Sequence, residues 1–140
     1  MRRILVAIDG SDAAHKATRM AADVAQRFGA RITLVYVVPR LLLPPDVYGL
    51  TVAEVEREQR AHGEKLVSEA LARLGEPGVE ADTRILSGPP AESIAEAAQA
   101  EDVDLVVVGS RGRGAAARVL LGSTSTRLVH ICPKPILVVH

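Results

Sequence analysis

Three glycines and two hydroxyl residues stand at fixed spacing in the C-terminal third of the chain, in the pattern Gly109-x2-Gly112-x9-Gly122-Ser123-Thr124. The pattern directly follows an apolar run at residues 104–108. Glycines let backbone N–H groups approach a phosphate closely, and the start of a helix adds further donors and a favourable dipole. This spacing therefore predicts a phosphate-binding loop, with plain turn formation as the alternative.

Two better-known phosphate motifs do not match. The Walker A motif needs a glycine followed by lysine and then serine or threonine, and this sequence has no such triplet. The dinucleotide pattern is matched formally by Gly112, Gly114 and Ala117, but it follows the fourth predicted strand instead of the first, and no acidic residue lies about 20 positions further on. Both a P-loop NTPase and a dinucleotide-binding dehydrogenase are thus disfavoured.

Arginines within the same stretch give a third interpretation, an RNA contact of the RGG type. The chain carries 17 basic and 17 acidic residues, so it has no overall positive field to collect nucleic acid, and at 2% aromatic residues it lacks a stacking platform for bases. We therefore expect no nucleic-acid partner. If Arg111, Arg113 or Arg118 points inward, it would strengthen phosphate binding by charge-assisted hydrogen bonds.

The remaining chemistry-bearing residues show no catalytic or metal-binding pattern. The four histidines have no metal-ligand spacing among themselves or with Cys132, and no nucleophile elbow or general base stands out. A single cysteine suits a reducing compartment. No run approaches the ~18 apolar residues of a membrane span, so we expect a cytoplasmic protein with no membrane partner.

Five β-rich runs must position the loop. They cover residues 3–8, 31–38, 79–86, 104–108 and 135–139, and helix-like stretches separate them. Most are nearly continuous apolar runs, as in strands covered on both faces, whereas the third run alternates and carries charges, as an edge strand does. The alternation predicts an α/β fold, a doubly wound parallel sheet with helices on both faces.

Four helices are expected between these strands. The first begins after Ser11 or Asp12 and ends at Gly29, the second covers residues 51–74, the third begins after Pro89 and Pro90, and the fourth ends before Pro133. The core-facing residues predicted for the first helix are Ala17, Met20, Ala21, Val24 and Phe28. Those predicted for the fourth are Leu120, Leu121, Thr124, Leu128 and Ile131.

Ligands of open parallel sheets bind at the carboxyl ends of the strands, where the winding direction reverses. This rule selects four segments: Asp9-Gly10-Ser11, Val37-Val38, Leu86-Ser87-Gly88, and the chain from Gly109 onward. The segments after the first and fourth predicted strands place glycine beside carboxylate or hydroxyl groups, which is what a nucleotide site needs.

These motifs together resemble the ATP-binding subgroup of the universal stress proteins. The subgroup carries G-x2-G-x9-G-[ST], which residues 109–123 match without a gap, and the resemblance extends to ILVAIDGS, LVYVV and HICPKPILVV. It implies a Rossmann-like fold of the adenine nucleotide alpha hydrolase type, with five parallel strands in the order 3-2-1-4-5. It also implies one domain over residues 1–140.

The resemblance further implies a role for each matching residue. Ala7 would line the floor of a nucleotide site, Asp9 would face the ribose or a divalent ion, and the backbone of Val37 would meet the adenine edge. The phosphates would lie against Gly109, Gly112, Arg113, Gly122, Ser123 and Thr124. ATP would be the bound ligand, with Mg²⁺ or Mn²⁺ held through its phosphates instead of by a set of protein ligands. Thr124 departs from the family, which often has an apolar residue there.

Three functions remain open. The first is a homodimer, paired through the strand from Pro135 to Val139, that binds ATP and acts as a nucleotide-responsive stress or signalling module. In that case, binding could order the connection over residues 39–50. The second is a slow ATPase or phosphotransfer enzyme, and the third is a protein-interaction module with no nucleotide.

Overall fold

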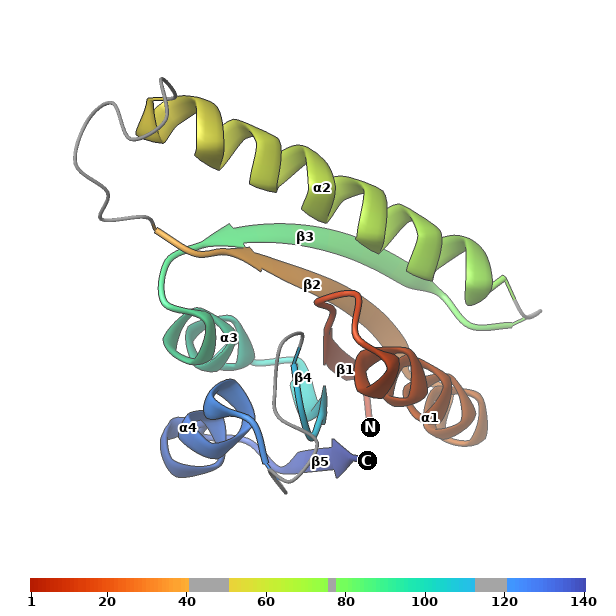
Figure 1. The fold of residues 1–140 in the computed structure, drawn as a ribbon. Coiled ribbons are helices and arrows are strands. Elements are labelled where there is room, and N and C mark those ends of the chain that lie inside the picture. The colour runs from red at the N-terminus through yellow and green to blue at the C-terminus, as the bar shows by residue number, and fades with distance from the viewer. Residues whose placement is uncertain (41–50, 76–77, 113–120) are drawn as a thin grey trace.

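The computed structural model describes residues 1–40, 51–75, 78–112 and 121–140. Strands and helices alternate along the chain (Figure 1). Their order is β1 (Arg3–Ala7), α1 (Asp12–Phe28), β2 (Arg31–Val38), α2 (Val52–Arg73), β3 (Ala81–Ser87), α3 (Pro90–Ala98), β4 (Val103–Gly109), α4 (Ser123–Ile131) and β5 (Ile136–Val139). Within the described ranges, no helix is both long enough and apolar enough to span a bilayer.

The strands form one parallel sheet in the order β3-β2-β1-β4-β5, as predicted. The central strands β1 and β4 lie side by side, and the chain winds outward from them in both directions. The charged strand β3 stands at one edge, which confirms the sequence interpretation. Because all strands run the same way, their carboxyl ends share one edge of the sheet.

Two layers of helices cover the sheet, α1 and α2 on one face and α3 and α4 on the other (Figure 1). Successive residues of β1 point to opposite faces, so Ile4 and Val6 pack under α1 and α2, whereas Leu5 packs under α3 and α4. All three are at most 1% exposed. Burial on both faces explains why these strands read as continuous apolar runs.

Local sequence signals set the helix ends. Ser11 caps α1 by accepting a hydrogen bond from the Ala14 amide at 3.1 Å, and Gly29 ends the helix in the left-handed conformation with φ of 65°. Thr51 and Glu54 form a capping box at the start of α2. Pro90 occupies the first turn of α3, where its missing N–H has no helical partner to lose.

One prediction about α1 is wrong. Met20 and Phe28 were expected to face the core, but they are 42% and 63% exposed. The buried face instead carries small residues: Ala14, Ala17, Thr18, Ala21 and Ala25. Alanines allow the helix axis to lie close to the strands, so a face chosen by the largest apolar residues was misplaced.

Candidate functional site

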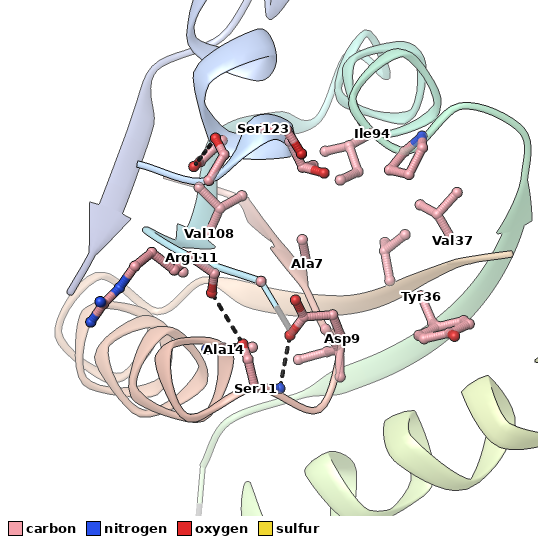
Figure 2. Close-up of a pocket in the computed structure, with 18 of the residues that line it drawn as sticks. Ala7, Asp9, Ser11, Ala14, Tyr36, Val37, Ile94, Val108, Arg111 and Ser123 are labelled. Carbon is pink, nitrogen blue, oxygen red and sulfur yellow. Dashed lines mark hydrogen bonds between the residues drawn. The ribbon is translucent and has the colours of Figure 1, made fainter. Parts of the chain in front are cut away.

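A hollow of about 540 Å³ opens at the carboxyl edge of the sheet, above the junction of β1 and β4 (Figure 2). Its volume lies within the range of small-molecule sites, ~300–1,000 Å³. The described residues that line it come from the ends of β1, β2 and β4 and the starts of α1, α3 and α4. This is where the rule for open parallel sheets predicts a ligand.

Eight of the nine predicted site residues line this one hollow. They are Ala7, Asp9, Val37, Gly109, Gly112, Gly122, Ser123 and Thr124. The ninth, Arg113, lies outside the described residues, as do Arg118 and residues 41–50 of the connection expected to respond to a ligand. Segments more than 100 positions apart in sequence thus meet at one place.

Asp9 follows β1 and contributes a carboxylate to the hollow. One oxygen, Oδ1, accepts a hydrogen bond from the Ser11 amide at 2.9 Å, which fixes the side chain against the start of α1. The other oxygen, Oδ2, lies 2.9 Å from the point where a Cβ on residue 112 would stand. Gly112 therefore covers the carboxylate with backbone alone.

The two ends of the glycine pattern are joined through Ser110. The Gly122 amide donates to the Ser110 carbonyl at 2.6 Å, and the Ser125 hydroxyl, which is buried, donates to the same carbonyl at 2.9 Å. A Cβ on Gly122 would stand 3.3 Å from the amide nitrogen of Gly112. The fixed spacing of the motif therefore corresponds to two backbone segments in direct contact.

Gly109 has a packing reason of its own. A Cβ at this position would stand 2.8 Å from the backbone of Ala13 and from the Ala14 nitrogen. The glycine thus allows the first turn of α1 to rest on the end of β4. The sequence had attributed Gly109 to phosphate contact, and the structure adds this second requirement.

The start of α4 faces the hollow without a side-chain cap. Gly122 is its N-cap residue and makes no side-chain hydrogen bond, and Ser123 and Thr124 of the first turn line the hollow. The positive end of the helix dipole is thereby directed toward the cavity, together with two hydroxyl groups. Such an arrangement suits an anion.

Arg111 lines the hollow with its main chain while its guanidinium points away from it (Figure 2). Its carbonyl oxygen accepts a hydrogen bond of 3.4 Å from the Ser11 hydroxyl, which ties the loop after β4 to the start of α1. Arg111 therefore ties the chain after β4 to α1, and its guanidinium does not point inward, which was one of the possibilities that the sequence left open for Arg111, Arg113 and Arg118.

Several lining residues were missed from the sequence. Pro90 and Ile94 of α3 add apolar lining to the hollow. Figure 2 shows Ile94 between Ser123 and Val37. The proline after the third strand indicated where α3 begins, but not which face of α3 would line the hollow. Ser87, selected by the strand-end rule, lies elsewhere: it lines a second hollow beside the first.

No metal-binding group is preformed in the described part of the chain. No cluster of three or more histidine, cysteine, aspartate or glutamate side chains is found there. Asp9 is the one carboxylate among the described lining residues of the hollow.

Comparison with known proteins places this geometry in a family. The family model described as the universal stress protein family matches residues 1–140. The chain belongs to the universal stress protein family. A curated universal stress protein of Thermus aquaticus is 40% identical over 140 residues, which cover 99% of this chain and 98% of the relative.

Solved structures of universal stress proteins share the fold. Universal stress protein UspA from Lactobacillus plantarum superposes with a TM-score of 0.86 at 29% identity, and the match covers 99% of this chain and 97% of that one. The Archaeoglobus fulgidus protein in complex with dAMP gives a TM-score of 0.76 at 22% identity, with 100% and 98% covered. An Arabidopsis thaliana family protein with AMP bound gives 0.69 at 21%, with 99% and 91% covered.

Proposed function

We propose that this universal stress protein binds an adenine nucleotide, with ATP as its full ligand, in the hollow at the carboxyl edge of the sheet. One observation carries the proposal: the hollow combines apolar lining from Val37, Pro90 and Ile94 with lining from glycine backbone and an uncapped helix start. A nucleotide has the same division between a flat base and charged phosphates.

These two kinds of lining suggest how the ligand would lie. The base would enter between Val37 and the pair Pro90 and Ile94, and the phosphates would lie against Gly112, Gly122 and the first turn of α4. The ribose would fall between them, near Asp9. Support for adenine comes from the Archaeoglobus and Arabidopsis structures, which hold dAMP and AMP.

A divalent ion would be held chiefly by the nucleotide. Mg²⁺ or Mn²⁺ prefers oxygen ligands and commonly binds through phosphate oxygens together with one or two carboxylates. Asp9 is the residue in the hollow that suits this role. When bound, the ion would neutralise phosphate charge.

The lining residues favour holding a nucleotide over hydrolysing it. Among the described ones there is no histidine or lysine, and the Asp9 carboxylate is already committed to the Ser11 amide through one oxygen. We therefore propose a nucleotide-responsive stress or signalling module instead of an ATPase or phosphotransfer enzyme. Phosphate release at catalytic rates that disappears in Asp9→Asn would reverse this preference.

Calorimetric titration with ATP, ADP and AMP, with and without Mg²⁺, tests nucleotide binding. Gly122→Val should weaken binding by more than about tenfold, because its side chain enters the contact between Gly122 and Gly112. Thr126→Ala, exposed on the same helix and outside the hollow, is the matched control and should keep the wild-type affinity. The proposal would be refuted if none of the three nucleotides gave a heat of binding.

We further propose that the protein is a homodimer paired through β5, the strand predicted to lie in residues 135–139. It is an edge strand whose residues Ile136 to Val139 are all half-buried, so a second copy would satisfy its free backbone groups and cover its apolar side chains. Sedimentation analysis should give twice the monomer mass of 14.8 kDa.

A cytoplasmic location and the extent of the domain over residues 1–140 stay predictions.

A further inference from the structure

A second hollow of about 510 Å³ lies next to the first at the carboxyl edge of the sheet. Pro39 lines both hollows. The other residues that line the second hollow are Val38, Arg40, Ala53, Glu56, Arg57, Arg60 and Ser87. Nothing in the nucleotide proposal uses this hollow.

Its position follows from the outer half of the sheet. Val38 and Ser87 are paired in the parallel register of β2 and β3, and the Gly88 amide donates to the Val38 carbonyl at 3.0 Å, so the two strand ends stay together. Helix α2 runs along these two strands (Figure 1). Its early turns therefore stand over the ends of both strands.

Two arginines of α2 face this position. Arg57 and Arg60 are three residues apart and lie on the same side of the helix. The Nη2 atom of Arg60 donates a long hydrogen bond of 3.5 Å to the Ser87 hydroxyl, which joins the helix to the strand end across the hollow. Arg40, just after β2, contributes the third guanidinium.

Among its described lining residues the hollow carries an excess of positive charge, with three arginines against the one carboxylate of Glu56. The ion pairs found in the described part of the chain involve other arginines: Arg2, Arg3, Arg31 and Arg127. An uncapped helix end does not contribute to this positive charge, since Thr51 and Glu54 form a capping box at the start of α2. In a chain of zero net charge, this is a local concentration of cations.

We propose that the second hollow is a binding site for a phosphoryl group, held by Arg40, Arg57 and Arg60 with the Ser87 hydroxyl as a further donor. A guanidinium presents a planar pair of N–H donors that matches two phosphate oxygens, and several such forks around one cavity favour phosphate over a single carboxylate. The ligand is either a free small phosphate or the second phosphoryl group of a ligand that also occupies the first hollow past Pro39. The proposal does not depend on nucleotide binding in the first hollow.

Two probes distinguish these sources: pyrophosphate alone, and adenosine 3′,5′-bisphosphate compared with AMP. Binding is followed by amide NMR at low ionic strength, because the arginines are exposed and salt screens them. Pyrophosphate should shift the amides of Ala53, Arg57 and Ser87 and saturate. Selective tighter binding of the bisphosphate than of AMP, with the same amides shifted, would identify a ligand that spans both hollows.

The variant Arg57→Gln/Arg60→Gln should lower the affinity for whichever probe binds by at least about tenfold, since two charge-assisted contacts are removed. Arg73→Gln, at the far end of the same helix and outside the hollow, is the control and should bind as wild type does. AMP binding should be equal in all three proteins, which separates this test from that of the nucleotide site. The proposal is wrong if neither probe shifts these amides, or if the double variant and Arg73→Gln weaken binding equally.

Discussion

The Asp9 carboxylate lies directly beneath Gly112, with Oδ2 only 2.9 Å from where a Cβ on residue 112 would stand. The other carboxylate oxygen is already held by the Ser11 amide. Residue 112 therefore controls where the Asp9 carboxylate can lie. The glycine pattern after β4 and the aspartate after β1, read separately in the sequence, act as one unit.

This relationship predicts non-additive effects of Gly112→Ala and Asp9→Ala on nucleotide affinity. The new methyl group should push the carboxylate aside and break its bond to the Ser11 amide, which weakens AMP and ATP binding in the wild-type background. Once Asp9 is alanine, the methyl group meets no other described residue within 4 Å, and Gly112→Ala should change affinity little. Residues in contact typically couple by ~0.5–3 kcal/mol, and a calorimetric double-mutant cycle measures this coupling.

Stability provides the control for that cycle. The methyl group would meet the far end of a side chain, which can rotate, so Gly112→Ala should lower the free energy of unfolding by no more than the loss of the Asp9–Ser11 hydrogen bond, about 1 kcal/mol. Additive losses of affinity in the cycle would show that Asp9 and Gly112 act independently, contrary to the geometry.

Gly109→Ala should behave in the opposite way and act mainly on stability. Its Cβ would stand 2.8 Å from backbone atoms of Ala13 and Ala14, which cannot move without shifting the first turn of α1. Overpacking of this kind costs ~1–3 kcal/mol, and urea unfolding would detect it. If Gly109→Ala unfolds like wild type and loses only nucleotide affinity, then contact with phosphate, and not the packing of α1, is the reason for this glycine.

Much of the fold was predictable because its signals are local. Continuous β-branched runs indicate strands buried on both faces, and Ser11, Gly29 and Pro90 mark helix ends through hydrogen bonds and dihedral angles within a few residues. The strand order 3-2-1-4-5 came from the family resemblance. The location of the hollow came from a topological rule that needs only the carboxyl ends of strands.

The remainder depended on distances between segments. Gly109 permits the first turn of α1 to approach β4 closely, and further along the helix Ala17 and Ala21 are buried while Phe28 is exposed. No periodicity in α1 alone shows either feature. The second hollow likewise exists only because α2 passes over Ser87. Its three arginines are separated by up to 20 positions in sequence and form no motif.

A third prediction concerns Gly63, in the middle of α2. Alanine there would gain up to ~1 kcal/mol of helix propensity, but its Cβ would stand 2.6 Å from Cε1 of Tyr36, whose ring packs beneath the helix. The clash should prevail, so Gly63→Ala should destabilise the protein by ~1–2 kcal/mol in urea unfolding.

Removing the Tyr36 ring should reverse the sign of the effect that Gly63→Ala has on the free energy of unfolding. Tyr36→Val alone should destabilise by loss of packing, but adding Gly63→Ala to it should then stabilise, because propensity is the effect that remains. A Gly63→Ala change that destabilises equally in both backgrounds would mean that the space over Tyr36 is not what selects glycine.

The last prediction concerns the amino edge of the sheet, where Arg3 links three strand regions. Its Nε donates to Asp102 at 2.7 Å, and Nη1 donates to Asp82 at 3.0 Å and to the Thr33 hydroxyl at 2.7 Å. The hydrogen bond from Arg3 is the main cause that lowers the pKa of Asp102 below its ordinary value of 3.8. The same pairing raises the pKa of Arg3, which therefore stays charged.

A carboxyl whose pKa is lower in the folded state contributes stability above its unfolded pKa and loses that contribution as the pH falls through the folded value. The stability difference between wild type and Asp102→Asn should therefore be constant at neutral pH and shrink once the pH drops below about 3.8, as Asp102 itself becomes protonated. Asp23→Asn, exposed on α1 and without an ion pair among the described residues, should show no such convergence. Urea unfolding across this pH range measures it. The difference at neutral pH should be small, because Asp102 is part-exposed and water screens the pair, and a difference that persists unchanged into acid would show that the Asp102→Asn substitution disturbs packing instead of charge.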